Sequence, residues 1–384
     1  MTTTVARGFL AAGVAAGIKS SGNRDVALVV NKGPKFHAAG VFTSNRVKAA
    51  PVLWSQQVLD STHSLKAVVL NSGGANACTG PEGFADTHHT AEYVAQQLGI
   101  APIDVAVCST GLIGTRLPMD KLIAGVDAAV AQLSDDGGSD AALAIMTTDS
   151  VPKTAHREGS GYAIGGMAKG AGMLAPGLAT MLVVITTDAD VEPAQLDIAL
   201  RNATARSFDR IDSDGCMSTN DTVLLLANGA SGVQPSMSEF ENLVAEVCSE
   251  LARKLIGDAE GASKDIRIRV SSAASESEAL DVARAISRSN LLKCAIHGED
   301  PNWGRVLAAI GTTAAAFEPD EIDVAINGVW VCRNGMTGDD RNLVDMSGRE
   351  VVITVSLRAG DAEATLWTND LTAIYVHENS AYSS

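Results

Sequence analysis

The sequence predicts an α/β (α+β) protein in which strands alternate with helices. Two segments repeat the same order of an apolar strand, a glycine-rich turn and an amphipathic helix. One runs from a strand at 65–70 through NSGGANACTG into a helix at 84–98. The other runs from 103–108 through STGLIG into a helix at about 118–133, where Pro118 suits the first turn. On pattern alone, this alternation favours parallel strands in the first half of the chain.

The C-terminal third has a different pattern, which predicts a smaller lobe that begins near residue 275. A helix is expected at about 276–288. After it, Asn327 and Gly328 lie between two runs of alternating residues, which is a strong signal for a β-hairpin. The run EVVITVSLRAGDAEATLWT predicts another pair of strands.

Composition and charge exclude several classes of function. The 384 residues include 29 Lys and Arg against 45 Asp and Glu, and the net charge of −16 would repel nucleic acid and anionic membrane surfaces. With 46% hydrophobic residues a compact core is expected, and no apolar run reaches the length of a membrane span. The stretch 9–18 only loosely resembles a secretory signal, because it contains glycines and lacks a leading basic cluster. A cytoplasmic location is therefore expected.

No metal or cofactor is expected from the motifs. The six cysteines are scattered without a C-x-x-C pair, and we expect reduced, mostly buried thiols. A phosphate loop, a zinc-binding helix and a nucleophile elbow are all missing from the sequence. The cluster at 212–215 loosely resembles a calcium loop, but Arg210 stands where the first ligand belongs, so a turn is expected.

The most unusual segment lies in the middle of the chain. Residues 165–177 contain five glycines and a proline, which is typical of a surface loop, yet most of the other residues are small and apolar. The segment leads into 180–187, a β-branched run that predicts a fully buried strand. Thr180 would therefore begin a central strand directly after a flexible loop.

A threonine in this position could act as a nucleophile. Its hydroxyl needs a base, and one recurrent solution uses the residue's own α-amine once the preceding peptide bond has been cut. That amine has a reference pKa of about 7.7–8.0, which suits a base near neutral pH. Ala179 is small enough for the Thr180 oxygen to approach its carbonyl group. The alternative is that Thr180 is simply a good strand former, and the pattern leaves both interpretations open.

The same loop also matches a dinucleotide-binding fingerprint. Residues 170–175 fit G-x-G-x-x-A, and Asp188 and Asp190 follow at about the right distance. That kind of site requires a helix to begin in the loop. Pro176, Gly177 and the β-branched run would break such a helix, so this interpretation is disfavoured.

The segment KGAGMLAPGLATML resembles the self-cleaving threonine motif of the ornithine acetyltransferase family of arginine biosynthesis, whose bifunctional members are also glutamate N-acetyltransferases. The blocks NSGGANACTG, STGLIG, MTTDSVPK, STNDT, DPNWGR and ENSAYSS are similar to family blocks in the family's order, and the actinobacterial members look most similar. The resemblance covers essentially the whole chain. It implies mixed sheets sandwiched between helices, as in the N-terminal nucleophile hydrolases, with a smaller C-terminal lobe at about 275–384.

The resemblance also implies the site residues. Cleavage between Ala179 and Thr180 would give an alpha segment, 1–179, and a beta segment, 180–384, which stay associated as two copies of each. Thr180 would be the nucleophile, with Thr110 and Gly111 forming the oxyanion hole. The substrate-binding residues would be Thr147, Lys169, Thr180, Glu260, Asn379 and Ser384. One departure from the family pattern is Cys216 and Met217, where small polar residues are more usual.

The activity implied by the resemblance is acetyl transfer from N2-acetylornithine to glutamate through an acetyl-enzyme, without a cofactor. The sequence leaves open whether acetyl-CoA is also a donor. Two alternatives remain at this point. One is an amidase or aminopeptidase on a similar self-cleaving scaffold, in which water accepts the acyl group, and the other is a non-catalytic binding protein that never cuts itself.

Overall fold

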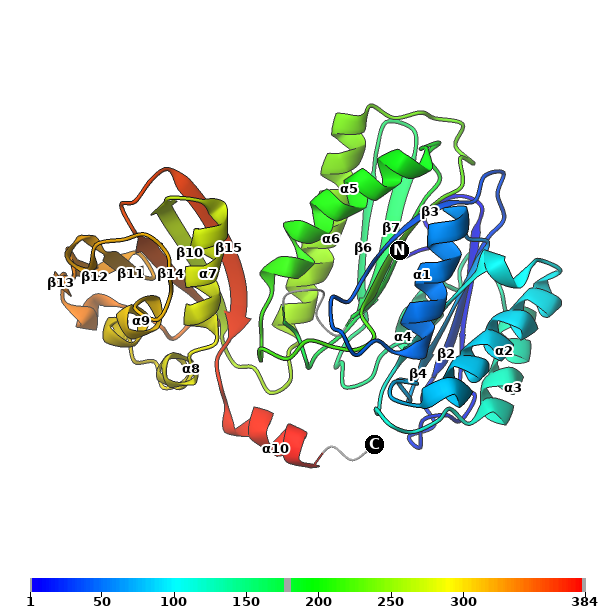
Figure 1. Cartoon of the computed structure of the whole chain (residues 1–384), viewed down its shortest axis with the longest axis horizontal. Coiled ribbons are helices and arrows are strands. Elements are labelled where there is room, and N and C mark those ends of the chain that lie inside the picture. Colours follow the sequence, from blue (N-terminus) through cyan, green and yellow to red (C-terminus); the bar gives the residue numbers. More distant parts are fainter. Residues whose placement is uncertain (1, 176–180, 382–384) are drawn as a thin grey trace.

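The computed structural model describes residues 2–175 and 181–381, and within them the strands form three sheets (Figure 1). The first sheet has four strands in the order β1-β2-β4-β5: Phe9–Val14, Val26–Asn31, Ala67–Ser72 and Val105–Thr110. The second sheet has five strands in the order β3-β9-β8-β7-β6: His37–Phe42, Thr222–Ala227, Leu182–Thr187, Ala163–Lys169 and Lys153–Glu158.

These two sheets pack face to face, and helices cover their outer faces. The core between them contains Val29 and Leu70 of the first sheet and Val184 and Leu224 of the second. Helices α2 (Gly80–Leu98) and α3 (Met119–Ala131) cover the first sheet, and α5 (Pro193–Ala205) and α6 (Met237–Gly257) cover the second. Helices α1 (Ala50–Thr62) and α4 (Gly138–Ala144) contribute to the core between the sheets. The expected sandwich of sheets between helices is therefore confirmed.

Strand direction is mixed, as the resemblance implies. Strands β4 and β5 are parallel, as are β8 and β9, whereas β1, β2 and β4 pair antiparallel, as do β6, β7 and β8. The parallel arrangement that the pattern alone favours is thus wrong for most pairs. Every residue of β4, β5, β8 and β9 is buried, because both faces of each sheet are covered.

The third sheet forms the smaller lobe. Its order is β13-β12-β11-β14-β10-β15, and its helices are α7 (Glu276–Ser287), α8 (Asn290–His297) and α9 (Trp303–Ile310). The strands are Met336–Thr337, Val329–Arg333, Asp323–Ile326, Glu350–Ser356, Asp265–Ala273 and Ala362–Asn369, in sheet order. The hairpin at Asn327 and Gly328 is confirmed, since β11 and β12 are antiparallel. Strands β14 and β15 also exist, but they do not pair with each other, because β10 lies between them.

Several boundaries differ from the predictions. Strand β10 belongs to the sheet of the smaller lobe, so we place the start of the lobe near Asp265 rather than near 275. Helix α2 begins four residues before the expected start at 84. All six cysteines are described and free, but only Cys108, Cys248 and Cys332 are buried, while Cys78, Cys216 and Cys294 are exposed. The expectation of mostly buried thiols is thus wrong for half of them.

The cluster at 212–215 forms a bend, as expected: the Gly215 N–H donates to Asp212 Oδ1 over 3.0 Å. Residues 170–175 contain no helix, which agrees with the rejection of the dinucleotide fingerprint. Among the described helices, none is long and apolar enough to span a membrane. The last helix, α10 (Ala373–Ala381), leaves the smaller lobe and extends back toward the larger one (Figure 1).

Candidate active site

Two of the expected site residues meet where a strand of each large sheet ends. Thr110 is the last residue of β5 and Lys169 is the last residue of β7. Lys169 Nζ donates a hydrogen bond to Thr110 Oγ1 over 2.9 Å, and both residues are almost fully buried, with 1% and 3% of their surface exposed. Because the threonine oxygen accepts this bond, its own hydrogen remains available for a further acceptor.

Gly111 follows Thr110 in a conformation that requires glycine. Its φ is +134°, and a Cβ there would lie 2.4 Å from the nitrogen of Gly74. The Gly74 N–H donates to the carbonyl of Thr110 over 3.0 Å, so the turn after β5 packs backbone against backbone on the turn after β4. This contact constrains the Gly111 peptide next to Thr110.

The buried carboxylate of Asp149 connects several segments of the chain next to Lys169. Asp149 Oδ1 accepts from the Gly170 N–H over 2.6 Å and from Lys153 Nζ over 2.5 Å, while Oδ2 accepts from the Thr147 N–H over 3.0 Å. Lys153 Nζ also lies 2.6 Å from Asp258 Oδ2. Thr147, the end of β7 and the loop after α6 are therefore positioned by one ion-pair network.

Burial and charge shift the pKa values in this network in definite directions. Burial lowers the pKa of Lys169, and the charge of Asp149 opposes that effect. For Asp149, burial alone would raise the pKa, but the charges of Lys169 and Lys153 and the bond from Gly170 hold it below its ordinary value. Asp149 is therefore a carboxylate at neutral pH, and it provides the counter-charge that a buried ammonium needs.

Glu260 lies in the turn after α6 and packs against the glycine-rich loop. Its N–H donates to the carbonyl of Ala171 over 3.0 Å, and a Cβ on Gly172 would lie 2.7 Å from its carboxylate. Asn379 of α10 donates from Nδ2 to Glu260 Oε2 over 2.9 Å. The structure thus brings two of the expected substrate-binding residues into direct contact and places the carboxylate against Gly172.

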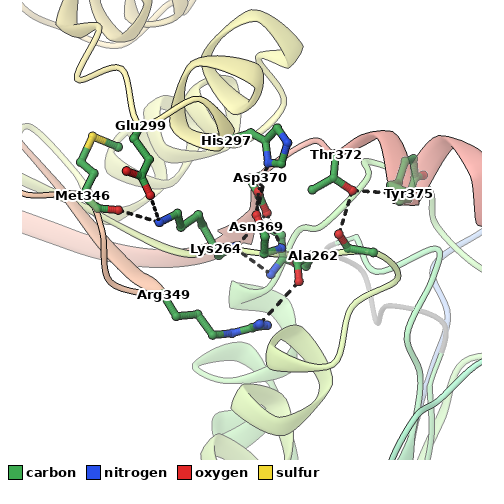
Figure 2. A network of polar contacts seen from close by, with 12 residues as sticks. Ala262, Lys264, His297, Glu299, Met346, Arg349, Asn369, Asp370, Thr372 and Tyr375 are labelled. Carbon is green, nitrogen blue, oxygen red and sulfur yellow. Dashed lines mark hydrogen bonds and ion pairs between the residues drawn. The ribbon is translucent and has the colours of Figure 1, made fainter.

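The start of α10 is held by a network of polar contacts, shown in Figure 2. Thr372 Oγ1 donates to the carbonyl of Gly261 over 2.7 Å and accepts from the Tyr375 N–H over 3.0 Å. A Cβ on Gly261 would lie 2.4 Å from the Tyr375 nitrogen. The residue after Glu260 is therefore packed directly on the first turn of α10, which explains how Asn379 reaches Glu260.

Ser263, His297 and Asp370 lie together in the same network but do not form a catalytic triad. Ser263 Oγ lies 3.2 Å from His297 Nδ1, and Asp370 Oδ2 lies 2.9 Å from the same nitrogen. A triad uses the two different ring nitrogens for the nucleophile and the carboxylate. Asp370 also accepts from the Lys264 N–H over 2.9 Å, so this cluster fixes the end of β15 just before Thr372 (Figure 2).

A cavity of about 750 Å³ opens beside Gly111 and Thr147. Other residues that line it include Lys19, Arg24, Gly73 and Asp149. Of the expected site residues, Gly111 and Thr147 line this cavity, whereas Thr110, Lys169, Glu260 and Asn379 do not belong to its lining. A space of this size can take a molecule as large as an amino acid and its acyl group.

Residues 179, 180 and 384 lie outside the described residues, so the structure does not place Ala179, Thr180 or Ser384. The strand that follows residue 180 in the sequence is described by the structure. Its first residue, Leu182 of β8, pairs with Lys169 of β7. The residue just before this strand is also described: the Met181 N–H donates to Asp221 Oδ1 over 3.0 Å, and Asp221 is fully buried. Burial holds the pKa of Asp221 well above its ordinary value.

Sequence reasoning missed Asp149, Lys153 and Asp221 as site residues. Asp149 and Lys153 lie in MTTDSVPK and Asp221 lies in STNDT, two of the blocks that carry the resemblance. A charged residue inside a block that resembles the family was the sequence signal that could have identified them as site residues. At the departure from the family pattern, Met217 accepts hydrogen bonds from Ser44 and Asn45, and the Cys216 N–H donates to Asp214. Among the described residues, no cluster of three or more His, Cys, Asp or Glu could hold a metal ion.

The fold and the site define a class of protein: two stacked sheets between helices, with a buried ammonium that donates to a threonine hydroxyl where two strands end, next to a glycine turn that lines a cavity. Comparison with known proteins gives the family. The model of the ArgJ family matches residues 10–384, and the chain therefore belongs to the ArgJ family. This confirms the resemblance, and with it the prediction of an acyltransferase of arginine biosynthesis.

Relatives agree with this assignment over their whole length. The arginine biosynthesis bifunctional protein ArgJ of Streptomyces coelicolor is 69% identical over 384 residues, which is 100% of both chains. The protein of the same name from Thermobifida fusca is 63% identical, again over 100% of both. Among solved structures, ornithine acetyltransferase of Mycobacterium tuberculosis complexed with ornithine is 60% identical, covers 47% of this chain and 96% of that chain, and has a TM-score of 0.45. ArgJ of Bacillus halodurans is 33% identical, covers 51% and 97%, and has a TM-score of 0.49.

Proposed function

We propose that this chain is a self-cleaving threonine acetyltransferase that moves the acetyl group of N2-acetylornithine to glutamate. The observation that carries the proposal is the buried bond from Lys169 Nζ to Thr110 Oγ1 at the end of β5, next to Gly111. It offers a cation for the α-carboxylate of an amino acid beside a hydroxyl donor for an oxyanion. Glu260, held by Asn379, supplies the carboxylate for the ornithine ammonium.

In the first half of the cycle, the Thr180 hydroxyl attacks the acetyl carbonyl of N2-acetylornithine. The α-amine of Thr180 takes the hydroxyl proton, and the Thr110 hydroxyl and the Gly111 N–H donate to the oxyanion. The amide bond then breaks, the departing nitrogen receives the proton, and ornithine leaves. The acetyl group remains on Thr180 as an ester.

In the second half, the α-amine of glutamate attacks this ester. The ester bond breaks, the Thr180 oxygen regains a proton, and N-acetylglutamate leaves. One amide is broken and a similar one is made, so the exchange needs no energy source. The same acetyl-enzyme could be formed from acetyl-CoA, which would make the enzyme bifunctional.

Cleavage between Ala179 and Thr180 would leave the two segments bound to each other. The alpha segment supplies β3, β6 and β7 of the second sheet, and the beta segment supplies β8 and β9. Strand β8 pairs with β7, and β9 pairs with β3, so the beta strands lie between alpha strands. We further propose two copies of each segment in the assembly and a cytoplasmic location.

Electrospray mass spectrometry of the purified protein tests the proposal. We expect two masses, for 1–179 and 180–384, and a gain of about 42 Da on the second after brief exposure to N2-acetylornithine. Thr180→Ala should give one uncleaved, inactive chain of 39.6 kDa, and the matched variant Thr180→Ser should still cut. An active Thr180→Ala protein would contradict the covalent scheme. Release of free acetate in place of N-acetylglutamate would support an amidase instead.

A further inference from the structure

The cavity beside Gly111 has a basic wall that the proposed cycle does not use. Lys19 and Arg24 both line it. Arg24 is already neutralised, since its guanidinium lies 3.0 Å from Asp140 Oδ1. Among the described residues, the lining also contains the carboxylate of Asp149, which pairs with Lys153, a lysine that it shares with Asp258. Of the two cations in this lining, Lys19 is therefore the one without an ion pair among the described residues.

The Lys19 ammonium is held in place without a carboxylate. Its Nζ donates to the carbonyls of Arg24 over 2.7 Å and Met146 over 2.6 Å. Within residues 2–175 and 181–381, no carboxylate forms an ion pair with it. An ammonium has three N–H groups, so one of them remains for a ligand. Neutral carbonyls position the charge but do not cancel it, which is the arrangement expected of an anion site.

The position of Lys19 places it beside the catalytic turn. A Cβ on Gly73 would lie 3.3 Å from Lys19 Cγ, so the lysine stem lies against the turn on which Gly111 packs. Its Nζ reaches the carbonyl of Met146, the residue before Thr147. Burial lowers the pKa of Lys19, the charges of Asp25 and Asp149 oppose this, and the charge of Lys169 adds to it. Both lysines therefore belong to one charged neighbourhood.

The proposed cycle creates a need for such a charge. Ornithine carries an ammonium at the end of its side chain, whereas glutamate carries a carboxylate there. Glu260 suits the first and repels the second. If glutamate turns about its N–Cα bond relative to ornithine, its amine can still reach the acetyl group while its two carboxylates meet two different cations.

We propose that the Lys19 ammonium binds the side-chain carboxylate of glutamate and thereby selects an acidic acceptor in the second half of the cycle. This inference rests on the proposed function. The phosphates of acetyl-CoA share the anionic chemistry of that carboxylate, so an experiment must separate the two sources.

The experiment measures each half of the cycle separately with Lys19→Met, which removes the charge and keeps most of the stem. Acetyl-enzyme formed from N2-acetylornithine, read as the gain of about 42 Da, should stay within about twofold of the parent. The preference of the acetyl-enzyme for glutamate over glutamine, its neutral isostere, should fall at least tenfold, mainly through the KM for glutamate. Lys19→Arg should keep most of the preference.

Two further variants control for folding and for loop anchoring. Lys121 Nζ donates to the carbonyl of Gly17 over 2.6 Å and does not line the cavity, so Lys121→Met removes an anchor of the same loop without changing the cavity charge. It should leave the preference unchanged. Ser20 is exposed and lines the cavity, so Ser20→Asp should fold normally and weaken glutamate use by repulsion, even if Lys19→Met fails to fold.

Each result decides between the possibilities. An unchanged ratio of glutamate to glutamine in Lys19→Met, or in Ser20→Asp if the first variant does not fold, overturns the inference alone. Loss of acetylation by acetyl-CoA, with the glutamate preference intact, assigns the charge to phosphate and also overturns it. A parent protein that never forms the acetyl-enzyme overturns the proposed function, and the inference with it.

Discussion

Replacing Thr110 by Val is the sharpest test of the oxyanion site. Valine has nearly the shape of threonine, so the change removes the hydroxyl and leaves the packing of β5 intact. It removes a donor to the oxyanion, which is expected to lower kcat/KM by about 100-fold to 1,000-fold. It also removes the acceptor of the Lys169 ammonium, which lies 2.9 Å away with 1% of its surface exposed. Losing a hydrogen bond to a buried charged group should lower the free energy of unfolding by about 1.5–3 kcal/mol.

Acetyl transfer from N2-acetylornithine to glutamate and urea unfolding measure the two effects. Thr110→Ser keeps the hydroxyl and should retain at least a tenth of the activity, by the same donor argument. Thr187→Val is the control for stability alone, because Thr187 is also buried but donates to the carbonyl of Ala163 at the end of β8 that does not border the site. Because the hydroxyl also accepts from the Ala189 N–H over 3.2 Å, the change should cost about 1–3 kcal/mol and leave kcat/KM unchanged. A folded Thr110→Val protein with more than about a third of the parent activity would refute the donor role.

Three further results are expected. Lys153→Met leaves the Asp149 and Asp258 carboxylates without their buried ammonium and should lower the free energy of unfolding by about 3–5 kcal/mol in urea titrations. Since the pKa of Asp149 is lowered in the folded protein, its contribution to stability is present above its ordinary value of 3.8 and is lost as the pH falls through the folded value; thermal melts in acid should show this loss in the parent. Asn379→Ala removes an exposed contact to Glu260, so the KM for N2-acetylornithine should rise several-fold while the melting temperature stays within about 2 °C.

Strands β4, β5 and β8 of the large lobe were predictable because every residue in them is buried. Mainly apolar runs such as Ala67–Ser72 and Val105–Thr110 are typical of strands that are covered on both faces, and each run ends at a glycine-rich turn. Strand direction was not predictable from the same runs. An apolar strand satisfies its backbone equally well beside a parallel or an antiparallel neighbour, and only the chain connections decide.

The smaller lobe shows how a local pattern can mislead. Strand β10, with the sequence DIRIRVSSA, alternates apolar and polar residues, which is typical of a strand. Its Arg269 pairs with Glu363 on the neighbouring strand β15. Strands β14 and β15 are joined by a short connection, which locally favours a hairpin. Instead, the connection crosses the end of β10, where the N–H of Leu357 donates to Ser271 and that of Ala359 to Ser272. Such a crossing depends on contacts distant in sequence, which no local pattern contains.

The site was predicted in part, and the resemblance supplied most of it. Lys169 by itself would pass for an ordinary loop lysine, and the structure shows it to be buried and bonded to Thr110. Asp149 and Lys153 were missed because an acid and a base four residues apart are usually solvated. What makes them important is that both side chains have 0% exposure, a property of the packing rather than of the sequence.

The smaller lobe reaches the candidate site by more than one route. Lys293 and Arg288 bind Ser213 and Asp212, which adjoin the glycine-rich loop at Leu174. The other route runs through α10. Asp370 fixes the end of β15, Thr372 joins that end to Gly261 and begins α10, and α10 then carries Asn379 to Glu260. Glu260 is therefore held both by the larger lobe, through Ala171, and by the smaller one. Since Lys169 is bonded to Thr110 within the larger lobe, a shift between the lobes would change the distance between Lys169 and Glu260, the residues that we propose bind the two ends of ornithine. Such a shift would disturb the proposed binding of the donor without disturbing the proposed oxyanion site at Thr110 and Gly111.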